Sequence, residues 1–334
     1  MRSAATTMLA HQIATRAIGG TVSITIIRDP ADGSARYAVS YESRGGRWPS
    51  RHRFQDITQA EAGGLSSYDL TMSNGFIIRA EGNYGAVFYA DGQTGASKPI
   101  FDMTGCNSSK IQGVTFYAMD QGGNPPAVLP SCAVLLASSS AGGDCNRNEI
   151  FGGGMAGFFS SCCLGMVAAT DNKITFVSMV QQATQQHGLP YCSPALVHST
   201  RPDWYLSSPY TPIIAGPANC GENTFDQVEI HGRNMQAGGW NAYFRDAYSV
   251  RFIGGNSSCE GGGTAHKLFQ GNNNRSILIS GMQYWAEDIG RGVVDPQHLI
   301  QADTATRLIM SACDENGAYS GSRLAGSFPG FVWQ

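Results

Sequence analysis

Hydrophobic residues recur along this chain in a frame of three positions: an anchor, the third residue after it and the fifth. Residues at offsets three and five face the same side of a strand, because strand side chains alternate with a period of two. The step from the anchor to the third residue breaks that alternation, as a bend or bulge does. Each unit therefore predicts two short strands joined by a bend. The units, some with one small residue in an apolar position, are Ile111, Val114 and Phe116; Ile150, Gly153 and Met155; Ile174, Val177 and Met179; Phe225, Val228 and Ile230; Val250, Ile253 and Gly255; Ile277, Ser280 and Met282; and Leu308, Ser311 and Cys313.

A second apolar patch precedes several of these units, with turn-forming residues between the two. Units of this kind are too small to fold alone, but parallel stacking at about 4.8 Å per layer buries a continuous inner stripe. Asn148, Asn172 and Asn223 stand shortly before their anchors, where a tight bend suits asparagine. We therefore expect an all-β chain folded as a right-handed parallel β-helix. A helical solenoid needs apolar spacings of three and four, and a β-sandwich does not keep this frame.

The chain divides into three parts. Residues 1–55 precede the units and contain a predicted hairpin around an Asp-Pro-Ala-Asp-Gly turn, so we expect an attachment or capping segment there. Residues 56–320 form the expected β-helix, and residues 321–334 a C-terminal tail or cap. Two insertions, at 118–147 and 181–221, depart from the repeat. The second is rich in aromatic and polar residues, which suits either a functional loop or packing between subunits.

Three stretches, PIFDMTGCNSSKIQGVTF, TDNKITFVSM and GENTFDQVEIHG, resemble layers of the pectin-lyase-like β-helix superfamily. Within it the chain is most similar to phage tailspike and tail-fibre proteins, over about residues 65–320. The resemblance lies in the repeat and in composition, without a signature motif. It implies a homotrimer on the tail of a virion, contacting a bacterial surface polysaccharide and held by other tail proteins through its N-terminal segment.

Composition narrows the remaining classes of function. Only 14% of the 334 residues are charged and the formal net charge is −3, so nothing favours nucleic acid as a partner. No apolar run reaches the roughly 20 residues that a membrane-spanning helix needs. His11, Gln12 and Arg16 interrupt the N-terminal region, so we expect no signal peptide, synthesis in the host cytoplasm and no membrane insertion.

Cysteine usage points to a reduced protein. The nine cysteines lack CxxC pairs and ligand spacing, so we expect thiols packed in the core, with no metal and no cofactor. The motifs of nucleotide hydrolases, serine esterases and zinc proteases are also missing from the sequence.

Equal offsets in neighbouring units are expected to stack into columns, which brings candidate catalytic carboxylates together. Glu260 and Glu287 share offset ten in successive units, so their expected separation is about 5 Å. That spacing suits a retaining glycoside hydrolase, in which repulsion keeps one carboxyl protonated as the acid. Glu229 is a third catalytic candidate, with Asp226 behind it as a ligand-binding residue. Carboxylates on a solvated surface are also ordinary, and that alternative stays open.

Ligand-binding candidates come from the column at offset six, which reads His231, Asn256, Gln283 and Asp314. Trp240 and Trp285 are candidate platforms for stacking sugars. A lyase would instead need a base and a neutralising cation, such as His231 or Tyr284 with Arg251 or Arg275.

These observations lead to one expected function and two rivals. We expect a tailspike-like protein that binds a bacterial surface polysaccharide and, if it is an enzyme, depolymerises it, by hydrolysis rather than elimination. The first rival is a structural or adhesive virion spike without an active site. The second is a stand-alone polysaccharide lyase or glycoside hydrolase.

Overall fold

The protein was analysed as a computed structural model, and the ranges that follow are those that it describes. They are residues 20–28, 35–43, 68–69, 75, 77–80, 87–89, 99–119, 123–138, 144–182, 193–198, 220–233, 240–245, 247–260, 267–272, 276–286, 300–302, 307–316, 324–325 and 331–334. Within these ranges the chain is all-β and contains no helix. No helix long and apolar enough to cross a membrane therefore occurs among them.

Almost all strands belong to two sheets, a large sheet of fifteen strands and a second sheet of nine. The large sheet contains β1 (Gly20–Arg28), β2 (Ala35–Ser43), β4 (Ile77–Ala80), β5 (Val87–Tyr89), β7 (Lys110–Ala118), β9 (Glu149–Gly157), β11 (Lys173–Thr175), β12 (Ser178–Gln182), β15 (Thr224–Arg233), β18 (Arg251–Glu260), β20 (Ile277–Ser280), β21 (Gln283–Ala286), β23 (Leu308–Ser311), β24 (Asp314–Asn316) and β26 (Phe331–Trp333). The second sheet contains β3 (Tyr68–Asp69), β6 (Phe101–Asp102), β8 (Val134–Ala137), β10 (Cys162–Val167), β13 (Ser193–His198), β16 (Trp240–Arg245), β19 (Lys267–Asn272), β22 (Ile300–Ala302) and β25 (Leu324–Ala325). A short pair joins β14 (Cys220–Gly221) to β17 (Ala247–Tyr248).

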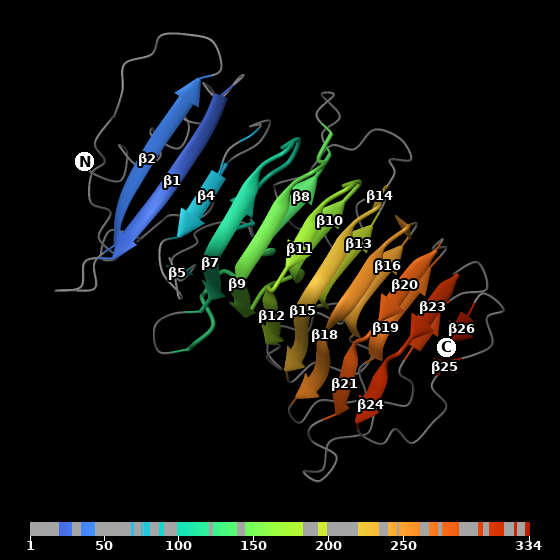
Figure 1. Ribbon diagram of the computed structural model, residues 1–334. Helices are drawn as coiled ribbons and strands as arrows, with labels where there is room; N and C mark the ends of the chain where they lie inside the picture. The colour runs from blue at the N-terminus through green and yellow to red at the C-terminus, as the bar shows by residue number, and fades with distance from the viewer. Residues whose placement is uncertain are drawn as a thin grey trace.

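The chain alternates between the two sheets. From β6 onward each strand of the second sheet is followed by strands of the large sheet, with β14 and β17 between them in two layers. Strands pair in parallel with their counterparts one layer away. Figure 1 shows the resulting stack of strands, which runs from the N-terminal to the C-terminal end. The expected stacking of parallel strands is thereby confirmed, and the arrangement is compatible with a β-helix or another solenoid.

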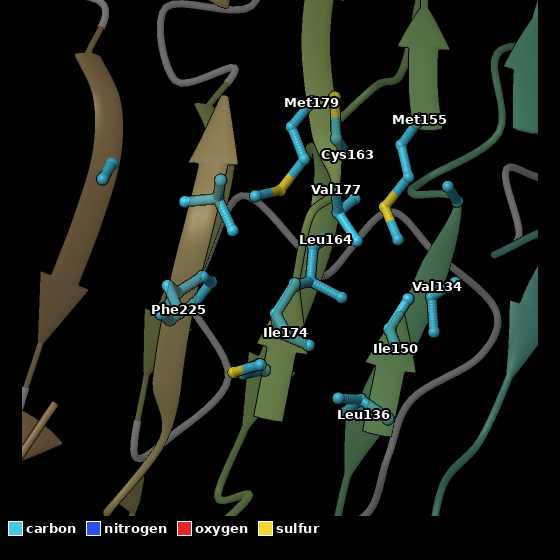
Figure 2. Close-up of a cluster of buried hydrophobic side chains, with 14 of the residues drawn as sticks. Val134, Leu136, Ile150, Met155, Cys163, Leu164, Ile174, Val177, Met179 and Phe225 are labelled. Atoms are coloured by element: carbon cyan, nitrogen blue, oxygen red, sulfur yellow. The ribbon is translucent and has the colours of Figure 1, made fainter. Parts of the chain in front are cut away.

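The sequence stretches NEIFGGGM and NKITFVSM share their spacing because they lie in adjacent layers. Ile150 is the partner of Ile174, and Met155 is the partner of Met179. All four side chains are buried, and Figure 2 shows them turned into the same apolar cluster. The repeated frame is therefore the inward face of successive layers.

The expected bend inside each unit is confirmed. Each layer has a residue in a left-handed backbone conformation there, with φ between 50° and 69°, and in two layers the next residue, Gly153 or Gly255, also has a positive φ. Register places these residues in one column, which we call the bend column: Gly113, Gly152, Phe176, Gln227, Gly254, Gly281 and Ala312. The bend lets the anchor and the third residue after it both point inward, as the broken alternation requires.

The bend before each first half-strand differs from expectation. The left-handed residues are Arg147, Asp171 and Glu222, each directly before an asparagine. The asparagines themselves are buried, with relative exposures of 1%, 1% and 0% for Asn148, Asn172 and Asn223. Their side chains form inward hydrogen bonds, and the left-handed bend falls on the residue before each of them.

The expected frame is wrong from Val250 onward. Phe225 pairs with Phe252, whereas Val250 follows Asn223 in the neighbouring column. The true anchors are Phe252, Ile279 and Met310. The sequence pattern places the anchors of these layers two residues too early. The position held by asparagine in earlier layers is occupied here by Val250, Ile277 and Leu308, which are apolar and as buried as the true anchors.

Both predicted insertions contain regular strands. β8 lies within 118–147 and β13 within 181–221, and each occupies an ordinary place in the second sheet. The remainder of these segments lies partly outside the described residues. The second insertion thus contributes one strand, β13, to the regular stack of the second sheet.

The two ends of the chain also join the sheets. β1 and β2 form the expected antiparallel hairpin, and β1 pairs in parallel with β4. At the other end β26 pairs in parallel with β23. Both ends of the large sheet are thus extended by the terminal segments.

The seven cysteines whose side chains the structure describes are free thiols, as expected. Six of them are buried, and Cys313 is half-buried.

Candidate functional site

The second half-strands of the large sheet carry two columns of in-register positions that alternate with the inward apolar ones, and we call them the outer columns. In β15, Val228, Ile230 and Gly232 are buried, while Glu229 and His231 between them are more exposed. The first outer column consists of Ser178, Glu229, Asn256, Gln283 and Asp314. The second outer column consists of Val180, His231, Ser258, Trp285 and Asn316, and within it Ser258 is buried, with a relative exposure of 1%.

One member of the column predicted at offset six is wrong. Asn256, Gln283 and Asp314 do lie side by side on successive strands, but their partner on β15 is Glu229. His231 stands in the next column, beside Ser258. The error has the same cause as the shifted frame.

Glu229, His231 and Ser258 form a connected polar group on this face. His231 Nδ1 forms a hydrogen bond with Ser258 Oγ. His231 Nε2 lies 3.9 Å from Glu229 Oε2, and the exposed fractions of the two side chains are 17% and 51%. An imidazole that contacts a hydroxyl at one nitrogen and a carboxylate near the other is held in one orientation. Such a group can accept or donate a proton toward a bound molecule.

A buried polar link lies beneath this group. Asn241, on β16 of the second sheet, is fully buried and donates through Nδ2 to Ser257 Oγ at 2.6 Å and to the Ser258 carbonyl at 2.9 Å. The same amide donates to the Ile230 carbonyl at 3.2 Å. Asn241 therefore ties the second sheet to the strands that carry Ser258 and His231, which makes that part of the face rigid.

Asp226 forms an ion pair with the neighbouring layer. Its Oδ2 lies 3.8 Å from Lys173 Nζ, one layer away, with both side chains partly exposed. Arg251 stands beside Thr224 on the neighbouring strand and not beside Asp226. A partly exposed ion pair of this kind contributes little to stability.

The remaining predicted residues are placed only in part. Glu260 ends β18 beside Arg233, and Cys259 pairs with Ala286, while Glu287 and Arg275 lie outside the described residues. The proximity of Glu260 to Glu287 thus stays a prediction. Trp285 lies on the large sheet and Trp240 on the second sheet, so the two do not share a column.

Two polar residues of the site escaped the sequence analysis. Ser258 was missed because the frame was shifted in its layer, and a correct register would have placed it beside His231. Asn241 was missed because it follows no repeat position of the large sheet. Its burial can be known only when both sheets are in place.

Neither metal sites nor relatives add to this picture. No group of three or more His, Cys, Asp or Glu side chains suited to a metal ion occurs among the described residues. Comparisons with models of protein families, with curated proteins and with solved structures found no match.

Proposed function

We propose that the protein is a tailspike- or tail-fibre-like virion component whose right-handed parallel β-helix binds a bacterial surface polysaccharide. The observation that carries the proposal is the first outer column, in which Glu229, Asn256 and Gln283 follow one another on adjacent strands. Strand spacing sets these groups about 4.8 Å apart, close to the repeat of sugars along a chain. Carboxylate and amide groups are suitable partners for sugar hydroxyls.

Depolymerisation is a second candidate function, favoured by the group around His231. The contact of His231 with Ser258 and its closeness to Glu229 provide an oriented acid–base residue on the same face. Glu260 and Glu287 remain the proposed catalytic pair of a glycoside hydrolase, and Trp240 and Trp285 remain proposed sugar contacts. The rival without chemistry is an adhesive spike that uses the same columns for binding alone.

The resemblance of the layers to tailspikes adds partners to the proposal. We infer a homotrimer on the virion tail, anchored to other tail proteins through residues 1–55. A parallel stack with an outward polar face is compatible with that role, since each subunit would present its columns along the length of the spike.

An array of purified bacterial capsular and O-antigen polysaccharides tests the function. We expect binding to at least one polysaccharide and weaker binding by Glu229→Gln and Asn256→Ala. Reducing-end and unsaturated-product assays on that polysaccharide separate hydrolase, lyase and adhesin. Light scattering should give three times the 35.5 kDa of one chain. A chain that bound nothing on the array would contradict the proposal, and a monomer would contradict the trimeric spike.

A further inference from the structure

Two phenylalanines stand together on the outside of the large sheet. Phe151, in β9, and Phe176, in the bend between β11 and β12, have exposed fractions of 42% and 57%. Their ring centroids are 5.7 Å apart and the ring planes meet at 88°, an edge-to-face contact. Large aromatic residues exposed side by side on a soluble surface usually mark a contact site.

The backbone of Phe176 strengthens this reading. Its φ is 53°, a left-handed conformation that bulky residues rarely adopt. In the bend column one neighbour of Phe176 is Gly152, where glycine carries no steric penalty, and the other is Gln227, whose φ of 52° is also left-handed. Because the Phe176 ring is mostly exposed, its burial contributes little free energy to offset that strain. Strain of this kind is concentrated at functional sites.

Next to the ring pair the surface lacks side chains. Residues 152–154 are three successive glycines of β9, and a Cβ added at Gly152 would meet no atom closer than 3.9 Å. We call the ring pair and these glycines the aromatic shelf. Hydroxyl groups border it, because Gly154 lies in register between Thr115 and Ser178.

A buried hydroxyl between the strands of the shelf also lacks a partner. Thr175 pairs in register with Phe151 and is directly followed by Phe176. It is 5% exposed, and among the described residues its Oγ1 has no hydrogen-bond partner. A buried hydroxyl without a partner costs free energy, which is a second local cost beside the strained backbone of Phe176.

The charges around the shelf are paired with one another. Lys110 Nζ lies 2.6 Å from Glu149 Oε2, and Lys173 Nζ lies 3.8 Å from Asp226 Oδ2. These pairs leave the shelf itself apolar in its centre and hydroxylic at its border. That chemistry suits a ligand with an apolar face and hydroxyl groups at its edge, and it does not select a charged one.

We propose that the aromatic shelf is a binding subsite for an uncharged pyranose unit of the polysaccharide. The C–H face of the ring packs on Phe151 and Phe176, and its hydroxyls reach Ser178 and Thr115. Ser178 is the neighbour of Glu229 in the first outer column, so a chain that crosses the shelf continues onto that column. This inference rests on the proposed function, and it specifies where on the protein an uncharged sugar unit binds.

The test compares Phe176→Gly and Phe151→Thr with the parent protein by titration calorimetry. The ligand is an oligosaccharide fraction of the array polysaccharide that binds most tightly. Each substitution introduces a residue type that a neighbouring layer already holds at that position, Gly152 for Phe176 and Thr175 for Phe151. We expect about a tenfold loss of affinity for each. Phe176→Tyr should retain binding. The matched control is Ile253→Thr, which removes an exposed apolar residue in the column of Phe151, three layers away.

Each outcome has one meaning. If the parent protein binds no polysaccharide on the array, the proposed function fails. If it binds and both phenylalanine variants match it, the aromatic shelf is not a subsite, while the proposed function stands. If Phe176→Gly or Phe151→Thr changes the mass measured by light scattering, the ring pair is a contact between chains, which also overturns the inference.

Discussion

Asn148 donates through Nδ2 to Asn172 Oδ1 at 3.0 Å, and Asn172 repeats the contact with Asn223 Oδ1 at the same distance. Each acceptor oxygen also receives the backbone N–H of the preceding asparagine, at 3.0 Å and 3.1 Å. At the first end of this ladder the N–H of Ser109 donates to Asn148 Oδ1. At the other end Val250 takes the next position, so the column changes from amides to apolar side chains.

Removing the middle asparagine of this ladder, Asn172, should destabilise the fold. Asn172→Ala leaves the backbone N–H of Asn148 without its acceptor in a buried position, and buried unsatisfied groups cost about 1–3 kcal/mol each. We therefore expect the free energy of unfolding to fall by about 2–4 kcal/mol, measured by urea denaturation. Lys173→Ala, at the exposed next residue, is the control and should change the stability by less than about 1 kcal/mol. Equal stability of Asn172→Ala and the parent would show that the ladder is dispensable.

Two adjacent glycines should respond very differently to alanine. Gly152 and Gly153 both have positive φ, of 65° and 84°. A Cβ at Gly153 would lie 2.0 Å from the Val114 carbonyl oxygen, whereas one at Gly152 would meet nothing within 3.9 Å. Gly153→Ala should therefore cost about 3 kcal/mol or more, and Gly152→Ala only the strain of about 1–2 kcal/mol. Thermal unfolding of the two variants side by side provides the measurement, and similar midpoints would refute the close approach of β9 to β7.

The buried thiols should be unreactive in the native protein. Burial, followed by the influence of Cys106 and Asp102, raises the pKa of the Cys145 thiol well above its usual range, so its reactive thiolate is scarce. Among the seven cysteines whose side chains the structure describes, only Cys313 is partly exposed. Iodoacetamide at pH 8 followed by peptide mass spectrometry should modify Cys313 before any other of the seven. Prior unfolding in guanidinium should make all of them reactive, and rapid native labelling of Cys145 would contradict its placement.

Loss of the Ser258 hydroxyl should weaken polysaccharide binding through His231. Ser258→Ala removes the hydrogen bond to His231 Nδ1, which frees the imidazole to turn away from Glu229. A neutral hydrogen bond contributes about 0.5–1.5 kcal/mol, so affinity should fall roughly three- to tenfold. The control is Ser280→Ala, which breaks a 3.1 Å hydrogen bond with Ser311 on the same sheet, away from His231. Unchanged affinity of Ser258→Ala, measured by calorimetry, would remove His231 from the binding face.

Much of the layer structure could be predicted from Ile150, Ile174 and Phe225. Their repeated frame depends on local chemistry, since an inward residue must be apolar wherever layers share a core. The bend followed from the same frame, because two inward residues three positions apart cannot lie on one straight strand. The strands of the second sheet were harder to predict from the sequence, as β8 and β13 show. The number of residues between the apolar run of such a strand and the next anchor differs from layer to layer.

The chain itself thus determined that strands stack in parallel layers and which side chains turn inward up to Phe225. Only the tertiary structure decided the register beyond it, because Val250 and Phe252 are both buried and the apolar pattern alone allows either as the anchor. Hydrogen bonding between layers selects Phe252, and with that choice Glu229 joins Asn256 while His231 meets Ser258. The outer columns depend on this pairing, since a shift of two residues moves every polar group to a different neighbour.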